Sequence, residues 1–141
     1  MFVYRISALS KLVASGNTSR WNSKGKYVIY SSSNRALACL ENIVHRSGEG
    51  LNIKFKILTI EIPDSIKKNE IKKFQSGWIN NYQIIQKIGD SWLDKNHTCI
   101  LRVPSAIIRE EHNILINPNH EDFNLVKLVK IEDFEFDSRL R

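Results

Sequence analysis

Residues 100–131 read ILRVPSAIIREEHNILINPNHEDFNLVKLVKI, and this stretch decides the fold class. The apolar runs at 100–103 and 114–116 and the alternating run at 125–131 predict three strands, because short β-rich runs bounded by Pro and Asn are typical of strands. The segments between them leave little room for crossover helices, which favours antiparallel neighbours. We therefore predict an α+β fold with a mixed or antiparallel sheet.

The rest of the chain adds strands and a few helices to this sheet. Alternation predicts strands at residues 2–6 and 53–60, and the β-rich run 27–30 predicts a buried strand. Serines 31–33 offer N-caps for a helix of about twelve residues that ends before Ser47. Weaker patterns predict a short helix at 7–12, a Lys-rich helix from Pro63 to Phe74, and a helix at 82–93 that is interrupted near Gly89.

The composition indicates a globular cytoplasmic protein. With 141 residues, we expect one domain spanning 1–141. No apolar run approaches the ~20 residues that span a bilayer, and the N-terminus shows no secretory signal. Cys39 and Cys99 are expected to be buried free thiols. The four histidines lack the spacing of a zinc site, so no metal is expected.

The positive charge is concentrated in the first half of the chain. The net charge is +6; residues 1–60 hold nine Lys or Arg against two acids, whereas residues 61–141 hold twelve against thirteen. Basic surface favours phosphates, nucleic acid or an acidic protein partner. A solvated surface without a specific ligand is the other interpretation of the same charge.

Two residues in this basic half suit a nucleotide ligand. Arg20 leaves the loop 16–19, and its guanidinium is a planar fork of donors suited to a pyrophosphate. An exposed arginine in a salt bridge is the alternative. Tyr30 ends the apolar run 27–30 and could stack on a flat heterocycle or offer its hydroxyl. A core tyrosine with a hydrogen-bonded hydroxyl is equally consistent with the sequence.

Glu41 lies on or beside an apolar stripe of the predicted helix, formed by positions 37, 40 and 44. A carboxylate there needs a reason, because burying a charge is costly. One reason is a buried salt bridge to Arg20 or Arg35. The other is function: its negative charge would stabilise an oxocarbenium ion as an N-glycosidic bond opens.

Ser105 follows Pro104 at the end of a predicted strand, where loops present side chains. No Gly-x-Ser-x-Gly elbow surrounds it, so a nucleophile of the hydrolase type is not expected. We expect it to hydrogen-bond a ligand or Glu41, or to serve only as a turn or cap residue. The lysines at 67, 68, 72 and 73 could form an RNA patch on the predicted Lys-rich helix, but no aromatic platform accompanies them.

Taken in order, these motifs resemble the RES domain family. Its pattern is matched by Tyr4-Arg5-Ile6, by Arg20-Trp21-Asn22 through Tyr30, by Ser31 to Glu41 with His45 one turn later, by Gly89 to Leu93, by Val103-Pro104-Ser105, and by Asn113 to His120. The resemblance therefore spans nearly the whole chain. One departure is Thr18-Ser19, where members usually carry two glycines that let the backbone approach a ligand closely.

The resemblance implies a fold like that of ADP-ribosyltransferases and a toxin that consumes NAD as a substrate, with no cofactor and no metal. Nicotinamide would be split from ADP-ribose by water or phosphate, or ADP-ribose would pass to a protein. Arg20 would bind the pyrophosphate, Tyr30 would pack on nicotinamide or its ribose, Glu41 would stabilise the ribosyl cation, and Ser105 would orient Glu41 or the ribose.

The resemblance also implies a partner and leaves two competing functions. An Xre-like helix-turn-helix antitoxin would bind the toxin, cover the site and form a hetero-oligomer with it, with no membrane and no direct nucleic-acid contact. The first alternative is a basic toxin that binds or cleaves RNA with Lys and His. The second, suggested by Thr18-Ser19, is an inactive module that only binds the antitoxin.

Overall fold

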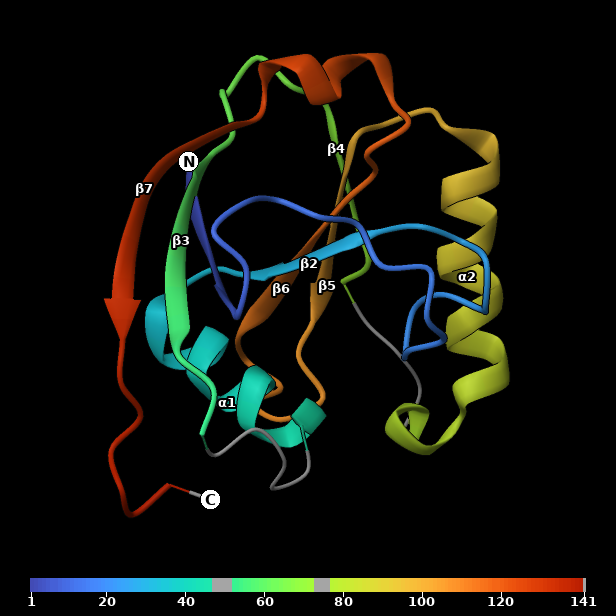
Figure 1. The fold of residues 1–141 in the computed structure, drawn as a ribbon. Helices are drawn as coiled ribbons and strands as arrows, with labels where there is room; N and C mark the ends of the chain where they lie inside the picture. The colour runs from blue at the N-terminus through green and yellow to red at the C-terminus, as the bar shows by residue number, and fades with distance from the viewer. Residues whose placement is uncertain (47–51, 73–76, 141) are drawn as a thin grey trace.

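The computed structural model describes residues 1–46, 52–72 and 77–140. In these ranges the chain forms one seven-stranded sheet, two α-helices and two short 3-10 helices (Figure 1). The strands are β1 (Phe2–Ser7), β2 (Ile29–Ser32), β3 (Phe55–Glu61), β4 (Lys68–Glu70), β5 (Ile100–Pro104), β6 (His112–Ile116) and β7 (Lys127–Phe134). The α-helices are α1 (Arg35–Arg46) and α2 (Tyr82–Lys95), and the 3-10 helices span Trp78–Asn80 and Glu121–Leu125.

The strand order confirms the predicted α+β fold with a mixed sheet. The order is β4-β5-β6-β2-β1-β3-β7, and each neighbouring pair is antiparallel except β4 and β5, which run parallel. The strands predicted from residues 100–131 are all present, although β7 begins two residues later and runs further than the pattern indicated. The buried strand predicted at 27–30 is displaced to Ile29–Ser32.

The sheet has two well-paired parts that meet at β1 and β2. Only Tyr4 and Ser32 are in register between these two strands, whereas β1 pairs with β3 along its whole length. Helix α1 packs on the β1–β3 part through a cluster that includes Ile6, Ala38 and Ile57. Helix α2 lies against the other part (Figure 1), where its Ile85 and Trp92 share a core cluster with residues of β5 and β6. The candidate site lies where these two parts meet.

Helix α1 has the twelve residues that the sequence predicts, but a different N-cap. The side chain of Asn34, and none of the three preceding serines, accepts a hydrogen bond from the backbone N–H of Leu37 at 2.8 Å. The helix ends at Arg46, so both Glu41 and His45 lie on it.

Helix α2 is continuous, so the predicted interruption near Gly89 is wrong. Gly89 is buried in the middle of the helix, and a Cβ built on it would lie 1.7 Å from the carbonyl oxygen of Trp21. The glycine is therefore explained by a close backbone approach, which lets α2 pack against the segment that follows Arg20.

Two other predicted helices are wrong. Residues 8–11 form bends and residue 12 is irregular, so no helix forms there; the Ser7 hydroxyl accepts a hydrogen bond from the Leu9 N–H, a local bond that competes with helical pairing. In the Lys-rich segment, Ile66 is buried in the core and residues 68–70 form β4, paired with β5. Tertiary packing thus overrides helix propensity there, and the proposed lysine patch is not on a helix; residues 73 and 74 lie outside the described residues.

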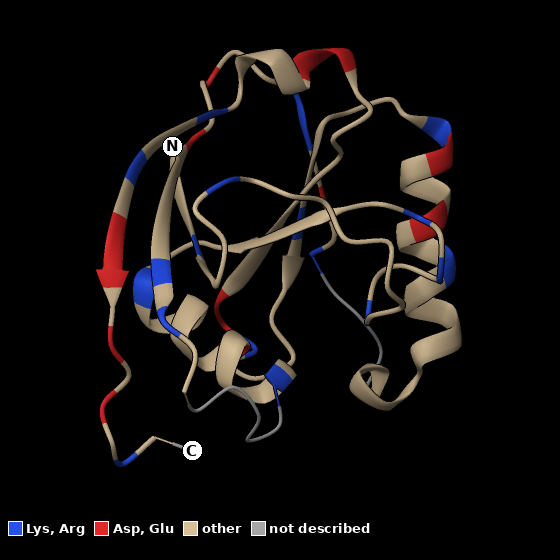
Figure 2. Cartoon of the chain, viewed as in Figure 1, with Lys and Arg blue, Asp and Glu red and all other residues tan. Residues whose placement is uncertain are grey.

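The charged residues are spread over many elements (Figure 2), with Lys and Arg on α1, β3, α2 and β7 and acids interspersed on α2 and β7. Within the described ranges, no helix has the length and apolar character needed to cross a membrane. Both cysteines are free; Cys99 is buried as expected, whereas Cys39 is only half-buried.

Candidate active site

Glu41 projects from the middle of α1 into a polar cleft. Its Oε1 accepts hydrogen bonds from the Ser105 hydroxyl at 2.9 Å and from the Asn113 side-chain amide at 2.7 Å. Its Oε2 lies 3.8 Å from Nε2 of His45, one helical turn further on. The Glu41 side chain retains 19% exposure. The carboxylate is therefore fixed at Oε1 by two hydrogen bonds, and the side chain stays partly exposed and lines the cleft.

The strand pair β5–β6 supplies the two donors that fix Glu41. Ser105 directly follows β5 and is fully buried, and its hydroxyl also accepts from the backbone N–H groups of Ile107 and Ile108 at 3.0 and 3.2 Å. Asn113 lies on β6. Ser105 thus contacts Glu41, one of the two roles expected from sequence, and its burial makes it a positioning residue for that carboxylate.

The predicted salt bridge between Glu41 and an arginine is not what the structure shows. Arg35 stacks on the ring of Tyr4, with 4.4 Å from its guanidinium carbon to the ring centroid. Arg20 donates to the backbone carbonyl of Ile79 at 2.6 Å and to the Tyr82 hydroxyl at 3.2 Å, and lies 4.7 Å from the centre of the Tyr82 ring. The position of Glu41 therefore has to be explained by its uncharged partners and by function.

Tyr30 presents its ring to the cleft, but its hydroxyl is already engaged. The hydroxyl donates to Oδ1 of Asn22 at 2.5 Å and accepts from the backbone N–H of Trp21 at 3.2 Å. Burial raises the pKa of Tyr30 well above its usual value. The sequence suggested that Tyr30 would either stack its ring on a ligand or offer its hydroxyl. Because the hydroxyl is engaged, contact through the ring face is the use that remains.

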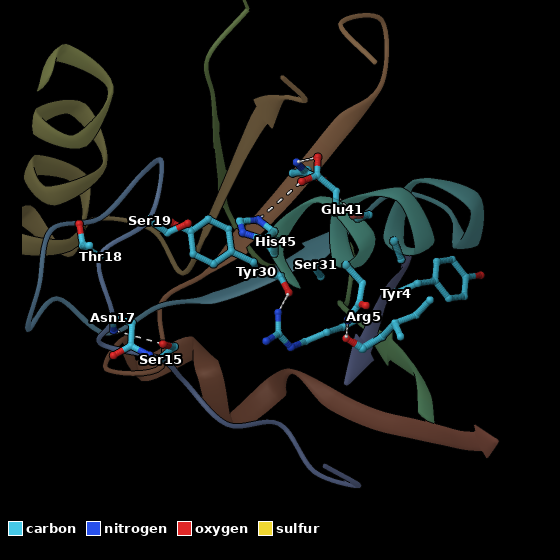
Figure 3. Close-up of a pocket in the computed structure, with 15 residues that line it drawn as sticks. Tyr4, Arg5, Ser15, Asn17, Thr18, Ser19, Tyr30, Ser31, Glu41 and His45 are labelled. Carbon is cyan, nitrogen blue, oxygen red and sulfur yellow. Dashed lines mark hydrogen bonds and ion pairs between the residues drawn. The ribbon is translucent and has the colours of Figure 1, made fainter. Parts of the chain in front are cut away.

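Two adjoining cavities meet at Glu41. The first, which we call the Arg5 cavity, has a volume of about 380 Å³ and includes Arg5 and Tyr30 in its lining (Figure 3). The second, the Arg20 cavity, has about 430 Å³ and includes Arg20 and Tyr82. Four residues line both of them: Thr18, Ser19, Glu41 and His45. Each cavity therefore has one arginine, with the carboxylate at their boundary.

Arg5 is a functional candidate that sequence reasoning did not single out. It lies on β1, lines the Arg5 cavity and donates to the backbone carbonyl of Tyr30 at 2.8 Å (Figure 3). Burial lowers its pKa from the usual value, which reflects the cost of holding a charge away from water. The available signal was a cation within an otherwise apolar strand, in the motif Tyr4-Arg5-Ile6.

Helix α2 holds the loop that carries Thr18, Ser19 and Arg20. The Gln86 amide donates to the Thr18 hydroxyl at 3.0 Å and to the Ser19 carbonyl at 2.8 Å. Asp90 accepts from the backbone N–H and the hydroxyl of Ser23 at 2.9 and 2.5 Å. Residues 18 and 19 are thus held by α2 and line both cavities.

The structure places all four predicted site residues at or beside the two cavities that meet at Glu41. Glu41 contacts Ser105 directly, and Tyr30 shares a cavity with Glu41; Arg20 shares the other cavity with it. The residues missed are Arg5, Asn113 and the α2 residues Gln86 and Asp90. A larger cavity of about 560 Å³ lies between α2 and strands β4 and β5, and it contains none of the predicted site residues.

The fold and the site define a class of protein: a small α+β protein that holds a fixed carboxylate between two cavities, each lined by one arginine. A model of the RES domain family matches residues 3–137. The chain is 34% identical over 143 residues to the Prs ADP-ribosylating toxin of Sphingobium sp. (strain YBL2), covering 97% of this chain and 89% of that protein. It is 33% identical over 145 residues to Toxin Res of Pseudomonas putida KT2440, covering 99% of each. The chain therefore belongs to the RES domain family and is a RES-domain toxin.

A solved structure shares the fold. The M. tuberculosis MbcT–MbcA toxin–antitoxin complex includes a chain that superposes with a TM-score of 0.77, at 13% sequence identity, over 94% of this chain and 83% of that one. At this low identity the likeness concerns the fold alone.

Proposed function

We propose that this RES-domain toxin consumes NAD by breaking the bond between nicotinamide and its ribose. The observation that carries the proposal is the Glu41 carboxylate, fixed by Ser105 and Asn113 at the boundary of two cavities that each hold one arginine. The name of the Sphingobium relative, an ADP-ribosylating toxin, supports an enzyme that uses NAD.

The two arginines suit a dinucleotide with a central pyrophosphate. A guanidinium has five N–H donors. Arg20 uses two of them on Ile79 and Tyr82, and those contacts hold the side chain in place while other donors are left for an anion. Arg5 is held in the same way by the Tyr30 carbonyl. The cavity volumes, about 380 and 430 Å³, are in the range of small-molecule sites.

The reaction needs a negative charge near the ribose carbon. As the glycosidic bond breaks, its electron pair goes to the nicotinamide nitrogen, nicotinamide leaves as a neutral molecule, and positive charge develops on the ribose. Glu41 stabilises that charge through the oxygen that Ser105 and Asn113 do not occupy. Because these donors fix the carboxylate before substrate arrives, little reorganisation is needed at the transition state.

The remaining lining residues have supporting roles in this proposal. The ring face of Tyr30 packs against nicotinamide or its ribose. The hydroxyl-bearing residues Thr18 and Ser19 border both cavities, where glycines would leave more room. We infer that they narrow the passage between the cavities and so reduce the affinity for NAD relative to members with two glycines.

Transfer of ADP-ribose to a protein is a second candidate outcome of the same bond cleavage. The specific observation in its favour is the printed name of the Sphingobium relative, which shares 34% identity with this chain. Water and inorganic phosphate are the other acceptors. All three reactions use the same residues for bond breaking and differ only in what attacks the ribose.

The proposed partner is an Xre-like helix-turn-helix antitoxin in the cytoplasm. The structural neighbour comes from a toxin–antitoxin complex, which supports a partner of this kind. Expression of the chain alone should deplete cellular NAD before growth stops, and co-expression with the antitoxin should restore growth and give one complex on gel filtration. Growth arrest at unchanged NAD, with loss of RNA, would favour the alternative of an RNA-cleaving toxin instead.

The direct test is to incubate the purified chain with NAD in phosphate-free buffer, in phosphate buffer and with cell extract. We expect free nicotinamide in stoichiometric amount with ADP-ribose, its phosphorylated form or ADP-ribosylated protein, and mass spectrometry of the products identifies the acceptor. Intact NAD in all three mixtures, with a folded protein by circular dichroism, would refute the proposal.

A further inference from the structure

His45 lines the cleft, and neither the proposed binding nor the proposed bond breaking gives it a role. It lies in the last turn of α1, its side chain is 56% exposed, and it lines both the Arg5 cavity and the Arg20 cavity. Figure 3 shows its imidazole beside Glu41 and Tyr30.

The two oxygens of Glu41 face different surroundings, and His45 is on the reactive side. Oε1 accepts from Ser105 and Asn113, whereas Oε2 is 3.8 Å from Nε2 of His45. The ring of Tyr30 is 6.5 Å away from the imidazole, centre to centre, and tilted by 46°, so it borders the histidine without covering it. An acceptor that approaches the ribose beside Oε2 therefore comes within reach of Nε2.

We propose that His45 is the general base that takes the proton from the group attacking the ribose, an assignment that rests on the proposed NAD cleavage. In the balanced step, the C1′–N bond to nicotinamide breaks and its electron pair goes to nicotinamide. A bond forms between C1′ and the oxygen of the acceptor, and the acceptor proton passes to Nε2 of His45 and then to solvent. The acceptor class is one that carries a proton when it enters, such as water or a hydroxyl group.

The other groups around the imidazole do not fit this role. Among the described residues that line the two cavities, the charged or titratable ones besides His45 are Tyr4, Arg5, Arg20, Tyr30, Glu41 and Tyr82. The arginines remain protonated at neutral pH, and the hydroxyl of Tyr30 is engaged by Asn22. Tyr4 lies under Arg35 and Tyr82 contacts Arg20. Glu41 is occupied with the developing cation, which leaves the imidazole, the side chain that most often acts as a general base in enzymes.

The test uses an acceptor that has no proton to lose. Nicotinamide release by His45→Gln is measured in phosphate-free buffer, first with water and then with added sodium azide, whose anion attacks without a base. With water we expect turnover to fall about 10²-fold or more, the usual contribution of a positioned general base. With azide we expect ADP-ribosyl azide to form within a few-fold of the wild-type rate.

The control is the same substitution at an exposed histidine outside the cleft, His97→Gln, which should behave as wild type with both acceptors. The pH profile gives a second readout: wild-type turnover with water should fall toward acid pH, as for any enzyme that needs a general base, and His45→Gln should lack that limb. Equal loss with water and azide would overturn the assignment in favour of a structural role, and unchanged turnover with water would overturn it outright. Absence of nicotinamide release by wild type would instead refute the proposed function itself.

Discussion

Gly89→Ala tests whether α2 must pack closely against Trp21, in the segment that follows Arg20. The added Cβ would lie 1.7 Å from the oxygen and 2.7 Å from the carbon of the Trp21 carbonyl, where ordinary contacts begin at 3.4 Å. The obstacle is backbone, so relief requires α2 to move by more than an ångström. That movement would also strain the hydrogen bonds that Gln86 and Asp90 make to the same segment.

The expected loss follows from these contacts. Overpacking against a rigid neighbour costs about 1–3 kcal/mol, each weakened hydrogen bond adds about 1 kcal/mol, and the better helix propensity of Ala returns about 1 kcal/mol. The free energy of unfolding should therefore fall by about 2–4 kcal/mol, a drop in Tm of roughly 6–12 °C for a chain of this size. The KM for NAD should rise as well, because the displaced loop carries Arg20.

The assay is urea unfolding and thermal melting beside NAD kinetics, with Gly16→Ala as the matched control. At Gly16 the three atoms nearest to the new Cβ all belong to the ring of Tyr27, the first at 2.8 Å, and that residue is 55% exposed, so its side chain has room to move aside. Gly16→Ala should therefore melt within a few degrees of wild type. Equal Tm values for the two variants would show that the close approach of α2 to Trp21 does not constrain the fold.

Two further predictions concern binding and the thiols. Arg20→Ala should raise the KM for NAD by about 10–100-fold, the scale of one or two charge-assisted hydrogen bonds, with a smaller change in kcat. The control is Arg109→Ala, a substitution at an exposed arginine. Equal KM values for the two variants would remove Arg20 from the binding site. Burial raises the pKa of Cys99 to about 11, so this fully buried thiol should resist a disulfide reagent at pH 8 until the protein unfolds. The half-buried Cys39 should react first, and rapid reaction of two thiols in the native protein would contradict this order.

Much of the fold could be predicted from local patterns. Alternating and short apolar runs predict most of the strands to within a few residues, because one or both faces of each strand are buried, as in β3, where four consecutive residues are buried. Helix α1 is predicted to within its twelve residues for the same reason. The segment 68–70 is different: the Lys-rich sequence from 63 to 74 favours a helix locally, whereas pairing with β5 decides the structure of 68–70.

The candidate site was less predictable, because its geometry depends on contacts between distant residues. Glu41 could be singled out as a carboxylate beside an apolar stripe. Asn113, which fixes it, is 72 positions away, and Arg5 is 25 positions from the carbonyl that holds it. Gly89 illustrates the same limit. A glycine within a helical pattern indicates a break in the helix, but here the glycine makes room for the carbonyl of Trp21, which is distant in sequence.

The most direct test of the account is NAD turnover by Glu41→Gln beside its Tm and its affinity for NAD. The amide keeps the shape of the side chain and an oxygen for Ser105 and Asn113, but it removes the negative charge. We predict a fall in kcat of about 10²–10³, as expected for the loss of one preorganised electrostatic contact, with NAD binding changed far less, because the cation develops only at the transition state. The exposed Glu110→Gln should match wild type. A folded Glu41→Gln variant with near-normal turnover would contradict the account.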